Sequence, residues 1–260
     1  MQNYESNKLK TATQIVQRIE NWPTAMEMRL RQGQAGRTRL LSFRDGLELA
    51  CRSGTRDWDV IHELLFAGSY ARAFSWLAAA PAGTQVLDLG GNLGLFSLLS
   101  ARHAPGAKIV AFEPGPPNFR MFEMNMLLNP QLASRVELRK QAVGGESRKD
   151  EWFFDHANPG GSSLFGRVGE SFPVQIVAFK EVIESLAVRG ALVKIDIEGA
   201  EYEILEKTPA SVWEKVGAIS LELHDDPGGV LTHEAFLERF RGYGFTVEEE
   251  SVCSFFLHRP

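Results

Sequence analysis

Cysteine is scarce in this sequence. The 260 residues include only two cysteines, Cys51 and Cys253, and neither belongs to a C-x-x-C pair. Disulfide scaffolds and structural zinc sites both need several cysteines at short spacings. The sequence therefore predicts neither a disulfide framework nor a zinc cluster.

A basic surplus and long apolar runs are also lacking. Asp and Glu (33) outnumber Lys and Arg (28), which gives a formal net charge of -5. Without a global basic field or a stripe of basic and aromatic residues, no nucleic-acid partner is expected. No stretch reaches the roughly 20 apolar residues of a membrane helix, and the opening MQNYESNKLK lacks the apolar core of a signal peptide. We therefore expect a cytoplasmic protein without membrane insertion.

The sequence does contain enough apolar material for a sizeable core, because 44% of its residues are hydrophobic and 23% are charged. This length and composition fit one α/β domain with an extension. Residues 1–80 predict a helix that ends before Trp22-Pro23, a β-hairpin around Asp45-Gly46 and two further apolar helices. We interpret residues 1–80 as a helix/hairpin extension, serving as a lid or as the surface of a possible homo-oligomer, and 81–260 as the main domain.

Short apolar strands alternate with helices from residue 84 onward. Strands are predicted at QVLDL, KIVAFE, RVELRK, ALVKIDI and GAISLEL, an irregular stretch follows RVELRK, and two strand-like segments close the chain. This alternation is typical of a mostly parallel sheet covered by helices on both faces. Residues 156–170, HANPGGSSLFGRVGE, form a long Gly/Ser-rich loop, and such loops are often functional.

Three glycines, Gly90, Gly91 and Gly94, follow the first of these strands in VLDLGGNLGLFSL. A dinucleotide fold needs G-x-G-x-x-G at this point. Asn92 and Leu95 stand where its second and third glycines would be. The loop therefore fits a ligand other than a pyrophosphate, unless its glycines serve a tight turn alone.

Two carboxylates flank this loop. Asp88, at the end of the strand, would repel a pyrophosphate but suits a ligand that carries an ammonium group. Glu113, which ends the next strand, can accept hydrogen bonds from both hydroxyls of a ribose. S-adenosylmethionine has an amino acid at one end, a nucleoside at the other and no phosphate, so it is the cofactor that we predict.

Longer stretches of the sequence resemble one family. These stretches are VLDLGGNLGLFS, VAFEPGPPNFRMFEMNMLLN and LVKIDIEGAEYEIL, together with CRSGTRDWDVIHELLFAGSY, GGSSL and ISLELH. The family that they resemble is the FkbM-type family of S-adenosylmethionine-dependent methyltransferases. The resemblance runs from about residue 43 to 224. It implies an α/β, Rossmann-like class I methyltransferase fold, with a seven-stranded, mostly parallel sheet whose last strand is antiparallel. It also implies an O-methyltransferase acting on natural products or glycans.

The resemblance further implies which residues form the site. It places the cofactor on Asp88, Gly90, Asn92, Gly94, Glu113 and Asn118, with the adenine near the backbone of Ala142. It also implies that Thr55, Asp57 and Tyr70 reach the methionine end of the cofactor or the lid.

Charged residues interrupt two strands that should be buried on both faces. Lys194 and Asp196 share one face of ALVKIDIEG, and Glu222 and His224 share one face of ISLELHDD. Both pairs lie at the carboxyl ends of parallel strands, where doubly wound sheets bind ligands. Methyl transfer to a hydroxyl needs a base, and Asp196 and His224 are the candidates, with Lys194 and Glu222 orienting or tuning them. The alternative is a structural ion pair between Lys194 and Asp196.

The same strand ends could act through a metal. Asp196, Glu222 and Asp225 are hard oxygen ligands, and with His224 they could hold Mg²⁺. The metal would then bind and acidify the acceptor hydroxyl. The sequence leaves this choice open.

Three further residues are candidates for substrate contacts. Ser162 and Ser163 lie in the Gly/Ser-rich loop, although turn chemistry explains them almost as well. Glu198 follows the strand that carries Asp196. Glu201 begins a predicted helix, where an acidic side chain complements the helix dipole, and we interpret it as structural.

These observations together predict an S-adenosylmethionine-dependent O-methyltransferase that acts on a hydroxyl of a sugar, glycan or secondary metabolite. One alternative is a catalytically silent protein that binds S-adenosylmethionine and serves as a partner. The other is an NAD-dependent dehydrogenase, against which Asn92 argues.

Overall fold

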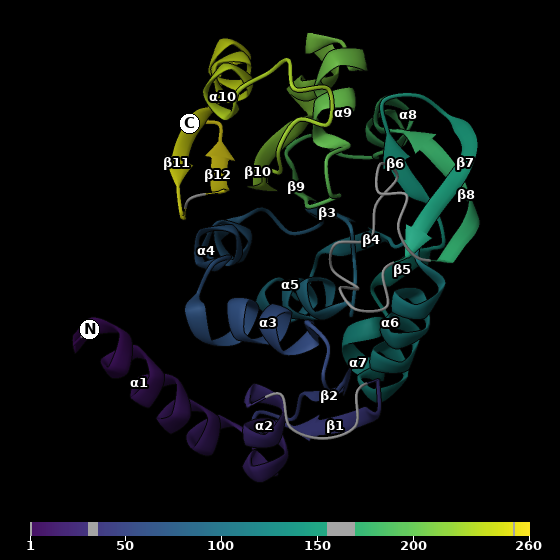
Figure 1. Ribbon diagram of the computed structural model, residues 1–260. Coiled ribbons are helices and arrows are strands. Elements are labelled where there is room, and N and C mark those ends of the chain that lie inside the picture. Colours follow the sequence, from purple (N-terminus) through teal and green to yellow (C-terminus); the bar gives the residue numbers. More distant parts are fainter. Residues whose placement is uncertain (1, 31–35, 155–169, 252) are drawn as a thin grey trace.

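A seven-stranded sheet forms the centre of the computed structural model, which describes residues 2–30, 36–154, 170–251 and 253–260 (Figure 1). The strand order is β11-β12-β10-β9-β3-β4-β5. The bounds are β3 (Gln85–Leu89), β4 (Lys108–Phe112), β5 (Val136–Arg139), β9 (Ala191–Ile195), β10 (Val216–Glu222), β11 (Thr246–Glu249) and β12 (Ser254–His258).

Strand β12 is the antiparallel member of this sheet. It pairs antiparallel with both β10 and β11, whereas β10, β9, β3, β4 and β5 pair in parallel. The predicted seven-stranded, mostly parallel sheet with an antiparallel last strand is therefore confirmed. The chain runs from β3 outward to β4 and β5 and then returns to β9 beside β3, and ligands bind where the order reverses in this way.

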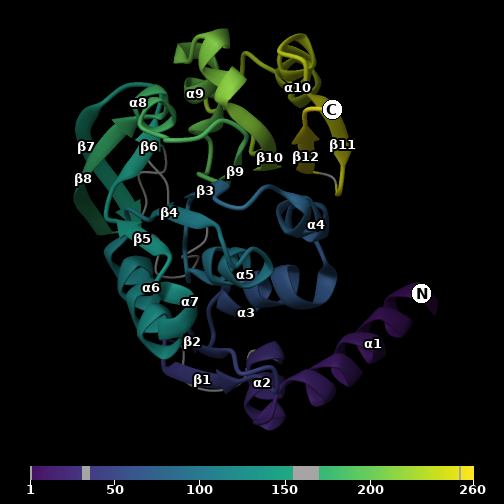
Figure 2. The same cartoon turned by 180° about the vertical axis from the view of Figure 1, so that it is seen from behind.

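Helices cover both faces of the sheet (Figures 1 and 2). Successive residues of β3 point to opposite faces, so Val86 packs in one hydrophobic cluster and Leu87 in the other. One face carries α5 (Leu95–His103), α6 (Pro116–Leu128) and α7 (Pro130–Ala133), and the other carries α8 (Phe179–Glu184), α9 (Glu201–Lys207), η3 (Ala210–Lys215) and α10 (His233–Gly242). Within the described part of the chain, no helix combines the length and the apolar character that crossing a bilayer requires.

The N-terminal extension packs against the α5 face. It consists of α1 (Gln2–Arg18), α2 (Trp22–Arg29), β1 (Thr38–Ser42), β2 (Glu48–Arg52), α3 (Asp57–His62), the π-helical segment η1 (Glu63–Ala67) and α4 (Ala71–Ala79). The predicted hairpin is confirmed, because β1 and β2 pair antiparallel from Thr38–Arg52 to Ser42–Glu48. Ile15, Leu49 and Ile61 belong to the same hydrophobic cluster as Phe96 of α5. The extension therefore shares a core with the sheet, and its service as a lid or oligomer surface stays a prediction.

Two asparagines of α6 hold the hairpin in place. Asn125 accepts a hydrogen bond from the N–H of Ala50 (2.7 Å) and donates to the carbonyl of the same residue (3.1 Å). Asn129 pairs in the same way with Glu48, at 3.1 and 2.7 Å. Residues four apart share one face of a helix and residues two apart share one side of a strand, so the two spacings match. The two asparagine side chains thus provide hydrogen-bond partners for backbone N–H and C=O groups along the edge of β2.

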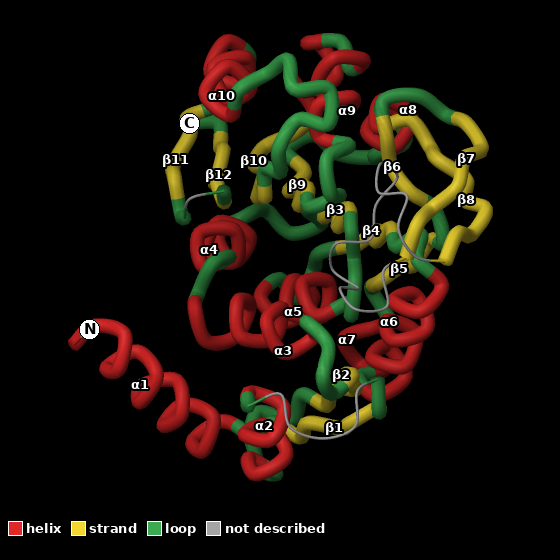
Figure 3. The backbone as a smooth tube through the Cα atoms, in the orientation of Figure 1, coloured by secondary structure: helices red, strands yellow, loops and turns green. Residues whose placement is uncertain are grey.

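A second, three-stranded sheet lies beside α8 (Figure 3). Its order is β6-β8-β7, with β6 (Ala142–Gly144), β7 (Arg148–Phe154) and β8 (Glu170–Ala178). The expectation of an irregular stretch after RVELRK is wrong for β7 and β8. The segment RKDEWFF lacks the alternation of apolar and polar residues that predicts a strand, and Arg148 instead pairs with Glu203 of α9 at 2.6 Å.

Candidate active site

The glycine loop lies between the carboxyl ends of β3, β4 and β9. Gly90 and Gly94 have φ angles of 83° and 80°, in the left-handed region that favours glycine. A Cβ atom on Gly90 would overlap the carbonyl oxygen of Asp196, and one on Gly94 would overlap the ring of Phe122. Contacts within the protein therefore require these glycines. That their backbone also lies against the cofactor stays a prediction.

Glu113 joins the loops that follow β3 and β4. Its carboxylate accepts hydrogen bonds from the N–H groups of Asn92 and Gly115, both at 2.8 Å, and the residue is 3% exposed. Burial raises the pKa of the Glu113 carboxyl to about 7, although the two backbone hydrogen bonds lower it. Each oxygen retains a second lone pair for a ribose hydroxyl.

Asp88 lies beneath the glycine loop and is fully buried. It accepts a hydrogen bond from the hydroxyl of Ser97 at 2.6 Å, and Nζ of Lys194 lies 3.5 Å from its Oδ1. We expected Asp88 to face a ligand ammonium group. The structure instead places a lysine of the same chain beside it and leaves its carboxylate no exposed surface.

Lys194 connects three groups at the end of β9. Its Nζ donates to the carbonyl oxygen of Gly90 at 2.7 Å and lies 3.0 Å from Oδ2 of Asp196. Burial alone would lower the pKa of Lys194, but the charges of Asp196 and Asp88 outweigh it and raise that pKa. The ion pair between Lys194 and Asp196 exists, and a catalytic task for either residue stays a prediction.

A cavity of about 40 Å³ lies above Lys194 and Asp196. One wall is the glycine loop from Gly90 to Asn92, and the other consists of side chains from α3 and η1, including Glu63. Tyr70 also lines the cavity, and its ring packs edge-on against Phe96 at 5.4 Å. The cavity thus lies where the methionine end of the cofactor is predicted.

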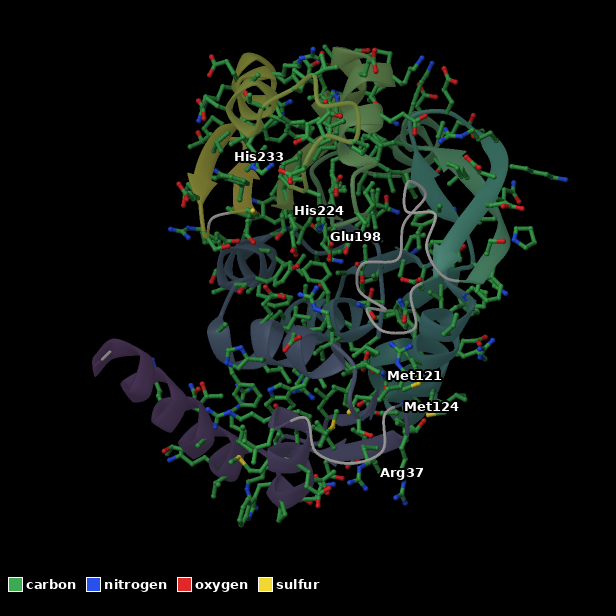
Figure 4. The ribbon with its side chains drawn as sticks, in the orientation of Figure 1. Arg37, Met121, Met124, Glu198, His224 and His233 are labelled. Atoms are coloured by element: carbon green, nitrogen blue, oxygen red, sulfur yellow. The ribbon has the colours of Figure 1, made fainter. Side chains whose placement is uncertain are left out.

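Beside this cavity, four carboxylates lie near one imidazole, and we call Asp196, Glu198, Glu201, Glu222 and His224 the acid–imidazole cluster. Figure 4 shows Glu198 and His224 of this cluster next to each other. Nδ1 of His224 lies 3.0 Å from the fully buried carboxylate of Glu201. Nε2 of His224 lies 3.5 Å from Glu198 and 4.0 Å from Glu222. The predicted gathering of Asp196, Glu222 and His224 at neighbouring strand ends is therefore present in the structure.

Glu201 orients His224 and shapes the preceding turn. Its carboxylate accepts hydrogen bonds from the N–H groups of Ile197 (3.1 Å) and Gly199 (2.7 Å). Glu201 also begins α9, as its interpretation as a helix-start residue requires. A fixed carboxylate on Nδ1 leaves Nε2 of His224 directed at the other acids.

Protonation in the cluster is shifted by burial and by neighbouring charge. Burial, with the charge of Asp196, raises the pKa of Glu198 to about 7, and the charge of Asp196, with burial, raises the pKa of Glu222 to about 8. Burial would lower the pKa of His224, but its hydrogen bond to Glu201 and the nearby carboxylates raise it to about 10. His224 is therefore protonated at neutral pH.

We predict that Glu222→Gln raises the melting temperature of the protein by a few degrees at pH 9 and has little effect at pH 5. The pKa of Glu222 rises from 4.5 to about 8 on folding, so folding favours the protonated carboxyl and stability is lost as pH rises between those values. Glutamine mimics the protonated form at every pH. Calorimetry at both pH values checks this, with exposed Glu214→Gln as the control, and a pH-independent difference would contradict it.

The turn that carries Glu198 is strained. Among the described residues, only Asn92 (φ 48°) and Glu198 (φ 56°) are non-glycine residues with positive φ. Both lie in loops of the site, where strained backbone is common. This conformation helps to place the Glu198 carboxylate against His224.

The set of possible metal ligands differs from the predicted one. Ligand atoms of Asp196, Glu198 and His224 all lie within 4.8 Å of one another. Asp225, expected as a fourth ligand, is fully exposed and lies 3.8 Å from His233 instead. The predicted inclusion of Asp225 is wrong, because the chain turns outward after His224.

Arg52 contacts three of the residues predicted to bind the cofactor, namely Asn118, Asp57 and Thr55, and none of the three lines the cavity. Arg52 donates to the side-chain oxygen of Asn118 at 2.8 Å and forms an ion pair with Asp57 at 2.8 Å. The Thr55 hydroxyl donates to the carbonyl of Arg52 (3.0 Å) and accepts from the N–H of Asp57 (3.2 Å). These residues fix the start of α3, and their predicted contacts with the cofactor remain predictions.

The remaining predicted contacts are those of Ala142 with the adenine and of Ser162 and Ser163 with the substrate. Ala142 begins β6 and is buried. Ser162 and Ser163 lie outside the described residues. Two features of the site were not predicted. Glu63 lines the cavity but stands among apolar helical residues in the sequence. Glu201 pairs with a histidine 23 residues away, and no local signal indicates this partner.

Known proteins show similarity to this chain. Methyltransferase 1 of Beauveria bassiana (strain ARSEF 2860) is 28% identical over 195 residues, covering 66% of this chain and 77% of that protein. The 31-O-demethyl-FK506 methyltransferase FkbM of Streptomyces tacrolimicus is 26% identical over 200 residues, covering 65% and 75%. The crystal structure of methyltransferase FkbM from Methylobacillus flagellatus KT has a TM-score of 0.48 and 11% identity, with 78% of this chain and 54% of that chain covered, so this chain spans about half of its length.

The profile of the methyltransferase FkbM domain matches residues 88–247, which is more than half of the chain. The matched region contains the glycine loop, Glu113 and the acid–imidazole cluster. The chain therefore belongs to the FkbM family of S-adenosylmethionine-dependent methyltransferases.

Proposed function

We propose that this methyltransferase is an O-methyltransferase that acts on a hydroxyl group of a sugar, glycan or secondary metabolite. The observation that supports the proposal best is the position of Asp196, which lines the cavity beside the glycine loop and also belongs to the acid–imidazole cluster. A carboxylate thus stands between the predicted methionine end of the cofactor and a group of acids that suits a hydroxyl-bearing acceptor. The relative from Streptomyces tacrolimicus is an O-methyltransferase by its name.

The residues present fit the cofactor. Glu113 would accept hydrogen bonds from the ribose hydroxyls, and the cavity beside Lys194 would receive the amino-acid end. When bound, S-adenosylmethionine supplies a methyl group activated by a positively charged sulfur. The carboxylate of Glu63 in the wall of this cavity favours a positively charged ligand.

We assign the proton acceptor to Asp196. Bound S-adenosylmethionine would give its methyl group to the acceptor oxygen, the bond from sulfur to methyl carbon would break, and S-adenosylhomocysteine would leave. The Asp196 carboxylate would accept the proton that the hydroxyl loses. Lys194, 3.0 Å away, orients that carboxylate. His224 has a pKa of about 10 and already carries a proton at neutral pH, so it is the weaker of the two candidates. Glu198 and Glu222 would accept hydrogen bonds from other hydroxyls of the acceptor.

A thermal-shift experiment separates this proposal from the NAD-dependent dehydrogenase. S-adenosylhomocysteine should raise the melting temperature and NAD should not, because a bound ligand stabilises the folded state by mass action. A silent partner protein would show the same shift. It would differ in transferring no methyl group to any acceptor.

A divalent cation is the second candidate for activating the acceptor, favoured by the closeness of Asp196, Glu198 and His224. The contact between Glu201 and Nδ1 of His224 resembles the outer contacts of metal-bound imidazoles. Because we assign the proton to Asp196, we predict that EDTA-treated, desalted protein keeps its methyltransferase activity. Loss of activity that added Mg²⁺ restores would establish the metal mechanism instead.

A further inference from the structure

The segment from Asp57 to Ala67 covers the glycine loop. Helix α3 continues into the π-helical segment η1, which ends at Gly68 with φ 78°. π-Helical turns are rare and occur frequently at functional sites. Val60, Glu63 and Leu64 of this segment line the cavity opposite the glycine loop.

A buried network holds this segment in position. Nε and Nη2 of Arg52 contact the two carboxylate oxygens of Asp57 at 2.9 and 2.8 Å, and Nη2 also donates to Asn118 of α6 at 2.8 Å. All three residues are less than a tenth exposed. The start of α3 is therefore fixed to both β2 and α6, and Glu63, further along the same segment, lines the cavity.

The other acids near the cavity already have a cation. Asp88 and Asp196 share Lys194, at 3.5 and 3.0 Å, and Asp88 has no exposed surface. For the Glu63 carboxylate, the described residues provide no hydrogen bond, and its burial, with the charge of Asp196, raises the pKa of this carboxyl. A positively charged group bound in the cavity would relieve this unfavourable charge.

We propose that Glu63 binds the α-ammonium group of the methionine portion of the cofactor, while Val60 and Leu64 pack against its methylene groups. The inference rests on the proposed binding of S-adenosylmethionine in this cavity, and it replaces the expected contact with Asp88. Val60, Glu63 and Leu64 line the cavity on the side opposite Gly90 and Gly91, so one carboxylate and two apolar side chains are available to this end of the ligand.

Calorimetric binding of two ligands tests the proposal. The first is S-adenosylhomocysteine, and the second is its desamino analogue, in which hydrogen replaces the α-amino group. Glu63→Gln should weaken S-adenosylhomocysteine binding about tenfold or more, as expected for losing a charge-assisted hydrogen bond, and leave the desamino analogue unaffected. Asp59→Asn, in the adjoining helix α3 and paired with Arg56, is the matched control and should bind both ligands as the wild type does.

The outcomes distinguish a failure of the Glu63 assignment from a failure of the proposed binding of S-adenosylmethionine. An unchanged affinity for S-adenosylhomocysteine, or an equal loss for both ligands, would overturn the assignment of Glu63 while wild-type binding still supports the proposed function. Wild-type protein that binds neither ligand would overturn both. Glu63→Gln keeps the size of the side chain, and its melting temperature without ligand verifies that the variant is folded.

Discussion

Replacing Asp196 by alanine is expected to lower turnover by roughly 10²- to 10⁴-fold, the range typical for losing a general base. The affinity for S-adenosylhomocysteine should remain largely unchanged, because Lys194 keeps its contacts with the carbonyl of Gly90 and with Asp88. Initial rates of methyl transfer, together with calorimetric binding, measure the two effects separately. The variant should therefore bind the cofactor and fail in chemistry.

Two further variants make this result specific. Asp196→Asn keeps the shape of the side chain but cannot accept a proton, so it should be as slow as the alanine variant. Asp225→Asn removes a nearby carboxylate that is fully exposed, and its turnover should match that of the wild type. Full turnover of Asp196→Ala would remove Asp196 from the catalytic residues.

The second large effect is expected at Glu113. Glu113→Ala should weaken S-adenosylhomocysteine binding by at least about tenfold, since hydrogen bonds to a charged group typically contribute more than the 1.4 kcal/mol that a factor of ten represents. The substitution also leaves the N–H groups of Asn92 and Gly115 without their acceptors, which loosens both loops. Calorimetry measures the affinity.

A loss of affinity must be distinguished from a loss of structure. The melting temperature without ligand shows whether Glu113→Ala is folded at the temperature of the titration. Glu137→Ala, on β5, removes a carboxylate that is 60% exposed and should leave the affinity unchanged. Methylthioadenosine, which lacks the amino-acid end, should lose affinity for Glu113→Ala as well, because the ribose is present in both ligands. Unchanged binding of both ligands would contradict the ribose assignment.

The sheet was predictable because its signals are local. ALVKIDI and GAISLEL are apolar runs of strand length, and each is followed by a helix. The hairpin was predictable from Asp45-Gly46 between two strand-like runs. The charged residues that follow these apolar runs, such as Asp196 and His224, do lie together at one edge of the sheet, and their role in the reaction stays a prediction.

The pairings within the site were not predictable, because they join residues distant in the sequence. The carboxylate of Asp88 accepts a hydrogen bond from Ser97 and lies beside Lys194, and no sequence pattern around Asp88 indicates either partner. Glu63 lies in an apolar helical run, so its position in the cavity depends on how α3 packs over the glycine loop. Asp225 follows His224 directly, yet Asp225 is exposed to solvent whereas His224 contacts the buried carboxylate of Glu201.

Transfer of tritiated methyl from S-adenosylmethionine into fractionated extract of the source cells shows most directly whether the protein methylates a hydroxyl group. Wild-type and Asp196→Asn protein would be compared in parallel. We predict label in a polysaccharide or organic-soluble fraction that is stable to mild alkali, as a methyl ether is and a methyl ester is not, and little label with the variant. Wild-type protein that binds S-adenosylhomocysteine but labels no fraction, or label that alkali releases, would contradict O-methylation of a hydroxyl group.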